Sequence, residues 1–303
     1  MSSKLMRAKQ FFAGFGVLLA GAVLLVLWAS ESRLDRTYEI EPRPVTLHSD
    51  AATIERGRHI ATIRGCTDCH GKDFAGRIFL DDPMIGRFVA TNLTRGKGGV
   101  GADFSDDDWV RAIRHGVRPN GKPLMIMPSD EFFQLSDDDL GAVIAYAKTV
   151  QAIDNSLPPS RVSPIGRFLI TVNRDIPILP AERIAHDAAT AASPAIGVTA
   201  AYGGYLASSC TTCHGAGFSG GKIPGVPPDW PDAANLTPAP DATPSKWNAA
   251  QFVNTLRSGV TPEGKNLNAR YMPWPAIGKM TDDELNALWV YFRGLPAKPF
   301  GNR

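Results

Sequence analysis

This sequence of 303 residues has almost no excess of either sign of charge, because 32 Lys and Arg residues nearly balance 30 Asp and Glu residues. The formal net charge is +2, and the chain contains no long run of basic residues. A clustered basic excess is the electrostatic signature of nucleic-acid binding, so the sequence predicts no nucleic-acid partner. Its 44% of apolar and 20% of charged residues are typical of a globular chain.

Long hydrophobic runs are also scarce, because only residues 11–29 form a long apolar stretch without a charge. At about 1.5 Å per helical residue, this stretch can cross a hydrocarbon core of about 30 Å. A cleavable signal peptide is the competing interpretation, but its apolar core is usually only about 7–15 residues long. No clean A-x-A cleavage site follows the run. We therefore predict an uncleaved transmembrane anchor.

The charges around this run predict its orientation. Lys4, Arg7 and Lys9 precede the run, whereas the charges that follow it are balanced in sign. Because basic flanks stay in the cytoplasm, we expect residues 1–30 to form a cytoplasmic N-terminus and a single membrane pass. The rest of the chain then lies on the other face, which is the periplasmic side of a bacterial inner (cytoplasmic) membrane.

Cysteines are few as well, and all four fall in two copies of one pentapeptide, CTDCH and CTTCH. The copies comprise Cys66, Cys69 and His70, and then Cys210, Cys213 and His214. C-x-x-C-H is the attachment motif of c-type haem: one helical turn presents two sulfurs to the haem vinyl groups and an imidazole to the iron. The sequence therefore predicts two covalently bound haem c groups, each with one iron.

Three other uses of these cysteines fit less well. A zinc site of four cysteines would leave both adjacent histidines unexplained. A thioredoxin-like C-x-x-C motif would need a βαβ context, and no such pattern is present. A disulfide framework is compatible with the periplasm but not with so few cysteines at these spacings.

The pentapeptides belong to a longer internal repeat. TNLT at residues 91–94 matches ANLT at residues 234–237, and LSDDDLGAVIAYAK matches MTDDELNALWVYFR further on. The segment between the two copies is rich in proline, alanine and small residues, so we expect a linker with little helix. The predicted parts are a tether at residues 31–49, a first domain at 50–150, a linker at 151–199 and a second domain at 200–303.

Helix signals dominate both copies. Ser105, Ser136 and Thr281 each open a capping-box pattern that is followed by apolar residues at helical spacing. No segment alternates between apolar and polar residues convincingly enough to predict a strand. The predicted fold class is therefore all-α.

Each iron needs a ligand opposite its histidine, and the repeat selects Met127 and Met272. Both methionines are followed by proline, and each lies nine residues before a predicted helix cap. A thioether is a soft, neutral ligand that favours ferrous iron and raises the reduction potential. Met125 has no counterpart, because Arg270 takes its place, and Met280 adjoins its cap too closely to reach a haem.

The other histidines are predicted to be surface or packing residues, because no candidate ligand should disappear from one copy of the repeat. His115 aligns with Ser258 and His59 with Tyr205, whereas His48 and His186 lie outside the repeated modules.

The order of these motifs resembles class I cytochrome c, with C-x-x-C-H near the end of a first helix, a later MP loop and a final aromatic-bearing helix. The finer pattern of NLT, GVGADFSDDDWVRAIRHGVRPNGKPL, MPS and LSDDDLGAVIAY is similar to the cytochrome c subunits of bacterial membrane-bound alcohol, aldehyde and gluconate dehydrogenases. Those subunits typically carry three haem motifs, whereas this chain carries two. The resemblance implies two tandem class I cytochrome c domains behind the transmembrane helix. It also implies that Asn92 and Asn235 lie near the haem propionates and that Arg114 and Arg257 pair with them. The alternative for the two arginines is an ordinary exposed position on a helix.

Iron with both a histidine and a methionine ligand has no open position, so these expectations favour an electron-transfer protein over an enzyme. A dihaem peroxidase is the catalytic alternative, but it would need a displaceable ligand at one iron, and the paired MP loops argue against that. We expect a membrane-anchored periplasmic dihaem cytochrome c that passes single electrons from a respiratory donor to an acceptor such as a terminal oxidase. The alternative is a cytochrome c subunit of a membrane-bound dehydrogenase or respiratory complex. The expected partners are redox proteins in or at the membrane (a dehydrogenase, a quinol-oxidising complex or a terminal oxidase), with no small-molecule substrate of its own.

Overall fold

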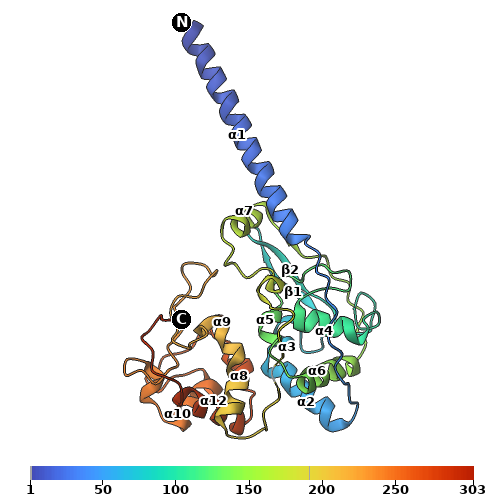
Figure 1. The fold of residues 1–303 in the computed structure, drawn as a ribbon, viewed down its shortest axis with the longest axis vertical. Helices are drawn as coiled ribbons and strands as arrows, with labels where there is room; N and C mark the ends of the chain where they lie inside the picture. Colours follow the sequence, from blue (N-terminus) through green and yellow to red (C-terminus); the bar gives the residue numbers. More distant parts are fainter. Residues whose placement is uncertain (1, 191) are drawn as a thin grey trace.

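One long helix stands apart from a head that contains all the other elements (Figure 1). The computed structural model describes residues 2–190 and 192–303. Helix α1, Ser2–Leu34, has a mean hydropathy of 2.4 over its apolar part, which is not buried against the head, so it is long and apolar enough to cross a membrane. Lys4, Arg7 and Lys9, which carry the orientation prediction, fall outside the described side chains.

Short helices around two apolar clusters build the head. The first domain contains α2 (Ala51–Ile63), α3 (Cys66–His70), α4 (Asp106–His115), α5 (Ser129–Phe132) and α6 (Asp137–Thr149). The second repeats this order with α8 (Ala200–Ala207), η2 (Ser208–Cys210), α9 (Thr211–His214), η3 (Thr243–Lys246), α10 (Ala249–Ser258), α11 (Trp274–Ile277) and α12 (Asp282–Arg293). The internal repeat of the sequence is therefore a repeat of the structure.

In each domain the first and last helices cross at a glycine. Helix α2 packs against α6, and α8 packs against α12. A Cβ atom at Gly57 would lie 1.9 Å from the carbonyl oxygen of Ala142, and one at Gly203 would lie 2.0 Å from that of Ala287. The two backbones can approach so closely only because glycine has no side chain.

Serine and threonine begin the predicted helices. Ser105 and Thr281 form complete capping boxes, as the sequence predicts. Ser136 also caps its helix by accepting a hydrogen bond from the backbone N–H of Asp139. The carboxylate of Asp139 does not complete that box, because it reaches toward the second domain instead.

The all-α prediction needs a correction, because the head contains a small antiparallel sheet in the order β1-β2-β3. Its strands are β1 (Arg77–Asp82), β2 (Gly86–Ala90) and β3 (Arg161–Val162). The register shifts between Ile78 and Leu80, and this irregularity removes the regular alternation by which a strand is recognised in a sequence. Strand β3 is only two residues long and comes from the linker.

The linker also contains more helix than predicted. Helix α7 (Pro164–Val172) and the 3-10 turn η1 (Pro180–Arg183) both lie within it. Proline at the first position of a helix is well tolerated, and Ser163 caps α7 just before it. Ile178 and Leu179 of the linker are buried in a third apolar cluster.

The predicted tether at residues 31–49 begins as part of α1, which continues to Leu34. Beyond the helix, the backbone N–H of Tyr38 donates to the carbonyl oxygen of Gly121 at 2.9 Å. The Arg111 side chain donates to the carbonyl oxygen of Ile40 at 3.2 Å. This segment therefore lies along the first domain and holds the head close to the base of α1.

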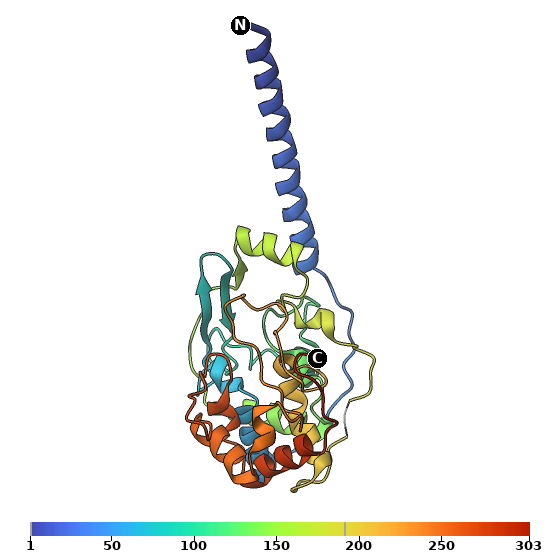
Figure 2. The same ribbon diagram turned by 90° about the vertical axis from the view of Figure 1, so that its left-hand side faces the viewer.

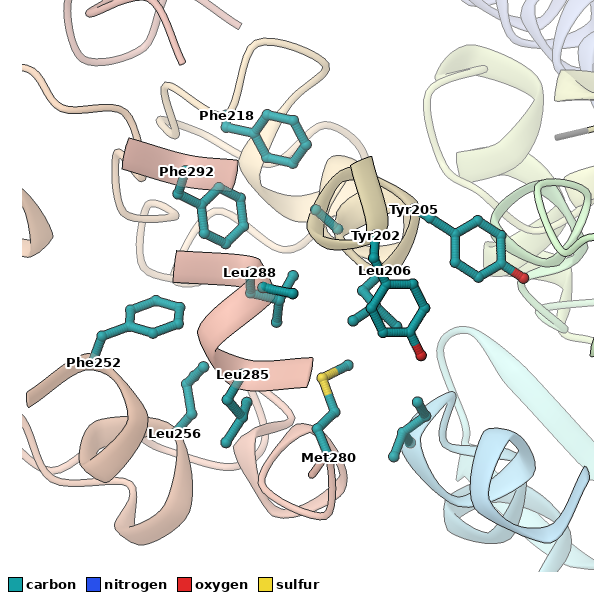
Figure 3. Packing of buried hydrophobic residues seen from close by; sticks show 13 residues of the cluster. Tyr202, Tyr205, Leu206, Phe218, Phe252, Leu256, Met280, Leu285, Leu288 and Phe292 are labelled. Atoms are coloured by element: carbon teal, nitrogen blue, oxygen red, sulfur yellow. The ribbon is translucent and has the colours of Figure 1, made fainter. Parts of the chain in front are cut away.

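Polar side chains join the two domains. The hydroxyl group of Tyr205 on α8 donates to Asp139 of α6 at 2.6 Å and accepts from the backbone N–H of Ser136 at 3.1 Å. Arg56 of α2 donates to the same carboxylate at 3.0 Å. Figure 3 shows the hydroxyl groups of Tyr202 and Tyr205 pointing out of the apolar cluster of the second domain.

A second carboxylate closes this interface from the opposite side. Glu284 of α12 lies 2.7 Å from the Nε2 atom of His59 and accepts a hydrogen bond from the Tyr202 hydroxyl group at 3.0 Å. A guanidinium nitrogen of Arg56 lies 3.6 Å from the same carboxylate. Each domain thus contributes one buried carboxylate that contacts a polar side chain of the other domain.

Candidate haem-binding sites

The first C-x-x-C-H motif forms one turn of helix, α3, directly after α2. Gly65 precedes the turn with φ of 73° and Gly71 follows it with φ of 84°. Both angles lie in the left-handed region that favours glycine, so the chain can bend sharply into and out of the turn. In the second copy the motif spans η2 and α9 and ends at Gly215, with φ of 80°.

Backbone carbonyl groups orient both histidines. The Nδ1 atom of His70 lies 2.8 Å from the carbonyl oxygen of Thr91, and that of His214 lies 2.7 Å from that of Ala234. A carbonyl oxygen only accepts, so Nδ1 carries the proton and Nε2 keeps a free lone pair. Burial lowers the pKa of both imidazoles, which favours the neutral form that binds iron.

A cavity of about 330 Å³ opens beside the first motif. Cys66, Cys69, His70 and Met127 all line it. The remainder of its lining is mainly apolar and includes Ile60, Phe74, Trp109, Leu135 and Val143. A mainly apolar cavity lined by two thiols, an imidazole and a thioether fits a haem macrocycle attached through C-x-x-C-H.

The thiols themselves are poorly suited to disulfide exchange. Burial raises the pKa of Cys66 and of Cys210 to about 12, and the neighbouring Cys69 contributes to the rise at Cys66. The thiolate is the reactive form of cysteine, so a low-pKa redox pair of the thioredoxin type does not fit this environment. All four cysteines are free rather than joined in disulfides.

The two predicted methionine ligands occupy turns of the same shape. The backbone N–H of Ser129 donates to the carbonyl oxygen of Met127 at 2.7 Å, and that of Trp274 donates to that of Met272 at the same distance. Met272 packs against the apolar cluster of the second domain. Met125 also lines the first cavity, so position alone does not separate it from Met127. Ligation by Met127 and Met272 stays a prediction that rests on the repeat.

Asn92 and Asn235 bond to the backbone in matching ways. The side chain of Asn92 accepts from the N–H of Thr94 at 2.9 Å and donates to the carbonyl oxygen of Ile153 at 2.8 Å. The side chain of Asn235 likewise accepts from the N–H of Thr237 at 2.9 Å and donates to the carbonyl oxygen of Lys298 at 2.8 Å. These amides hold the loop that carries the histidine-orienting carbonyl against the chain beyond the last helix. Their expected contact with haem propionates stays a prediction.

Arg114 and Arg257 pair with equivalent aspartates of the two domains. Arg114 is buried and lies 2.9 Å from Asp137, in the first turn of α6. Arg257 is less buried and donates to Asp282, in the first turn of α12, at 2.7 Å. Each arginine thereby ties its own helix, α4 or α10, to the start of the last helix of its domain. A role at the propionates remains a prediction for both.

Comparison with known proteins identifies the two repeats. Residues 200–296 match the family described as Cytochrome c, and residues 52–146 match the family described as Cytochrome C oxidase, cbb3-type, subunit III. The chain contains two cytochrome c domains. Both C-x-x-C-H motifs and the cavity beside the first one lie within these two domains.

Several relatives of this chain are named as cytochrome subunits. It is 28% identical to the cytochrome c subunit of alcohol dehydrogenase (quinone) from Gluconobacter oxydans, over 84% of this chain and 57% of the relative. It is 25% identical to the fructose dehydrogenase cytochrome subunit of Gluconobacter japonicus, over 94% and 60%. A shorter match, 40% identical over 31% of this chain and 22% of the relative, is to the gluconate 2-dehydrogenase cytochrome c subunit of Pantoea cypripedii. The chain thus spans less than two thirds of the length of these relatives.

Two arginines that line the cavity of the first domain were not predicted as site residues from the sequence. Arg118 and Arg64 both line the cavity, and burial lowers the pKa of Arg118. Arg64 also donates to the carbonyl oxygens of Leu206 and Tyr205 in the second domain, at 3.3 and 3.4 Å. A guanidinium group in a mainly apolar wall suits an anionic group of the ligand. Arg118 has Thr261 as its repeat partner, so a search for paired residues could not find it.

Proposed function

We propose that this protein is a dihaem electron-transfer cytochrome whose two domains each hold one covalent haem c. The observation that carries the proposal is the pair of C-x-x-C-H turns in which a backbone carbonyl group presents each imidazole for ligation. Cys66 and Cys69 would form thioethers to the first haem, and Cys210 and Cys213 would form thioethers to the second. A haem held in this way supplies a site that takes up and gives back one electron. The chain contributes the fixed imidazole, the methionine turn and an apolar wall that excludes water.

The haem content can be measured directly. Acid–acetone extraction should leave the colour on the polypeptide, because thioether bonds survive it. The pyridine haemochrome assay should give two haems per chain, and the Cys66→Ala/Cys69→Ala variant should give one. Colour that moves into the organic phase, or one haem in the parent protein, would contradict the proposal.

For the partner, we propose a membrane-bound dehydrogenase to which this chain belongs as the cytochrome subunit. The support is the similarity to such subunits along 84% and 94% of the chain. A free-standing carrier that delivers electrons to a terminal oxidase is the other candidate, and it shares the same haem chemistry. Purification in a mild detergent followed by mass spectrometry separates them: a large catalytic subunit in stoichiometric amount indicates the dehydrogenase, and the cytochrome alone indicates the carrier.

We further propose that α1 anchors the protein in the bacterial inner membrane with both domains in the periplasm. The support is the length of the apolar helix and the basic residues at its N-terminal end. Mass spectrometry should find residues 1–29 still attached, and high salt should leave the haem in the membrane fraction. A mature N-terminus near Ser30 with soluble colour would indicate a cleaved signal peptide instead.

A further inference from the structure

Helix α7 of the linker exposes its apolar side instead of burying it. Ile165, Phe168 and Val172 are 47%, 50% and 61% exposed. Their spacing of three and four residues places them on one face of the helix. The face turned toward the protein carries the small Gly166 together with Ile170, which are both buried. An ordinary surface helix shows the opposite arrangement, so this apolar face needs another partner.

The turn between β1 and β2 extends this apolar face. Met84 in the turn is 57% exposed. The backbone N–H of Ser163, the cap of α7, donates to the carbonyl oxygen of Ile85 at 3.0 Å, and its hydroxyl group donates to the carbonyl oxygen of Met84. A Cβ atom at Gly166 would lie 2.2 Å from the carbonyl oxygen of Ile85, so α7 rests directly on the turn. We call Met84, Ile165, Phe168 and Val172 the interfacial patch.

Hydrogen bonds fix α7 to the base of α1. Arg33 of α1 donates to the carbonyl oxygen of Ile170 at 2.6 Å, and Arg167 of α7 donates to Glu31 at 2.5 Å. In Figures 1 and 2, α7 lies across the end of the head from which α1 emerges. The interfacial patch is therefore held at the level of residues 30–33 of α1.

This level coincides with the end of the apolar run of α1. The run ends at Ala29, and Trp28, which is 69% exposed, immediately precedes it. Tryptophan is enriched where a membrane helix leaves the hydrocarbon core. A helix that crosses the bilayer through this run therefore brings α7 to the depth of the lipid headgroups. Before this level the apolar side chains of α1 are exposed, with Leu24 at 66% and Leu25 at 62%.

We propose that the interfacial patch inserts into the headgroup–acyl boundary of the bilayer that α1 crosses, so that α7 is a second, monotopic membrane contact. This inference rests on the proposed membrane anchor. An amphipathic helix in the plane of the membrane buries its apolar face about 5–10 Å into that boundary. Two contacts hold the head in one orientation, whereas a single helix would let it tilt. The β1–β2 hairpin also lines the first haem cavity through Phe79 and Phe88, so the patch sets the height of this cavity above the bilayer.

The test uses thiol reactivity in the full-length haem protein. The native cysteines are consumed by haem attachment, so an introduced cysteine is the only thiol that reacts. Val172→Cys reports on the patch, and Val290→Cys is the matched control on α12, at the end of the head away from α1 (Figure 1). Each variant is reconstituted in vesicles of phosphatidylcholine without any other protein and is treated with a charged, water-soluble maleimide. Leu24→Cys reports on the anchor itself.

The proposal predicts that the thiol at position 172 reacts more slowly than the thiol at position 290, which is the opposite of the order expected from their exposure. Val172 is 61% exposed and Val290 is 38% exposed, so without lipid contact the thiol at position 172 should react faster. If the patch is inserted in the bilayer, the thiol at position 172 should react at least about tenfold more slowly than the thiol at position 290. The reason is that the maleimide and the reactive thiolate are both excluded from lipid. The haem spectrum of each variant confirms that the domains are folded.

Three outcomes would overturn the proposal. Fast reaction at position 172 with protection at position 24 leaves the anchor in place but removes the second contact. Fast reaction at both positions 172 and 24 contradicts the anchor and the patch together. Protection at position 172 in native membranes but not in pure lipid vesicles would show that a protein partner, and not lipid, covers α7.

Discussion

Met127 and Met272 lie in turns of the same shape. In each turn the carbonyl oxygen of the methionine accepts a hydrogen bond of 2.7 Å from the backbone N–H of the residue after the proline. Met127→Ala should remove the methionine–iron charge-transfer band of the ferric first haem in the far red and lower its potential, because a soft ligand to ferrous iron is lost. Met272→Ala should do the same at the second haem. Visible spectroscopy and redox titration of each variant measure both effects.

Met125→Ala is the matched control for this prediction, since Met125 lines the same cavity two residues away. It should leave the charge-transfer band and the potential of the first haem nearly unchanged. Loss of the band in Met125→Ala and its survival in Met127→Ala would show that the repeat aligns the wrong methionine with Met272.

At the level of whole helices, the glycine crossings make an unusual prediction. Alanine in place of a helical glycine normally stabilises a helix by about 1 kcal/mol. Gly203→Ala should instead destabilise the second domain by about 1–3 kcal/mol, because its Cβ would lie 2.0 Å from the carbonyl oxygen of Ala287 and would force α8 away from α12. Gly57→Ala should act in the same way on the first domain. Urea unfolding followed by far-UV circular dichroism gives the change in the free energy of unfolding.

Gly204→Ala provides the control on the same helix. Its nearest neighbour would be the ring of Tyr291 at 3.0 Å, and a side chain can shift where a backbone carbonyl group cannot. We expect Gly204→Ala to change stability far less than Gly203→Ala. Equal effects of the two substitutions would mean that helix propensity, and not the close crossing, decides the outcome.

For the whole molecule, the carboxylate of Glu284 links the stability of the domain interface to pH. Burial by itself raises the pKa of Glu284, but hydrogen bonds from His59, the backbone of Thr281 and Tyr202 lower it to about 2 from an ordinary value of 4.5. A carboxyl group with a lowered pKa stabilises the folded state above its ordinary pKa and loses that effect as the pH falls. Between pH 4.5 and 2 the protein should therefore lose on the order of 3 kcal/mol of stability through this group.

Thermal unfolding of the parent protein and of Glu284→Gln at pH 7 and at lower pH tests this link. Glutamine can still complete the capping box but carries no charge, so the variant should be less stable at pH 7 and depend less on acid. Glu55→Gln removes an exposed ion pair and should have little effect at either pH. An acid dependence in Glu284→Gln as steep as that of the parent would show that other carboxyl groups dominate.

The orientation of the whole head is a further consequence of these contacts. The segment after α1 lies along the first domain, and α7 is bonded to the base of α1. The first domain is therefore the one nearest to α1 (Figure 1), and the proposed anchor would hold both domains at the membrane surface. A partner in the membrane would meet the first haem site before the second.

Local sequence was sufficient to predict the helical turn of C-x-x-C-H, the long apolar helix and most helix starts. Cys66, Cys69 and His70 lie within one helical turn, so their spacing alone brings them together. Ser105 and Thr281 cap their helices through groups three residues away, again within a single turn. The internal repeat then added long-range information, because a feature present in both copies must serve both domains.

Only the tertiary structure revealed the features that have no counterpart in the other copy of the repeat or that join distant segments of the chain. Strand β3 forms only where the linker meets β2, and Arg118 reaches the cavity from a loop whose counterpart carries threonine. The bonds of Asp139 and Glu284 cross between domains, so neither can be inferred from the pattern of one helix. Likewise, the apolar residues of α7 are visible in the sequence, but only the contacts with Glu31 and Arg33 place them beside the base of α1. Each of these features joins segments far apart in the chain, and their meeting depends on how the domains pack.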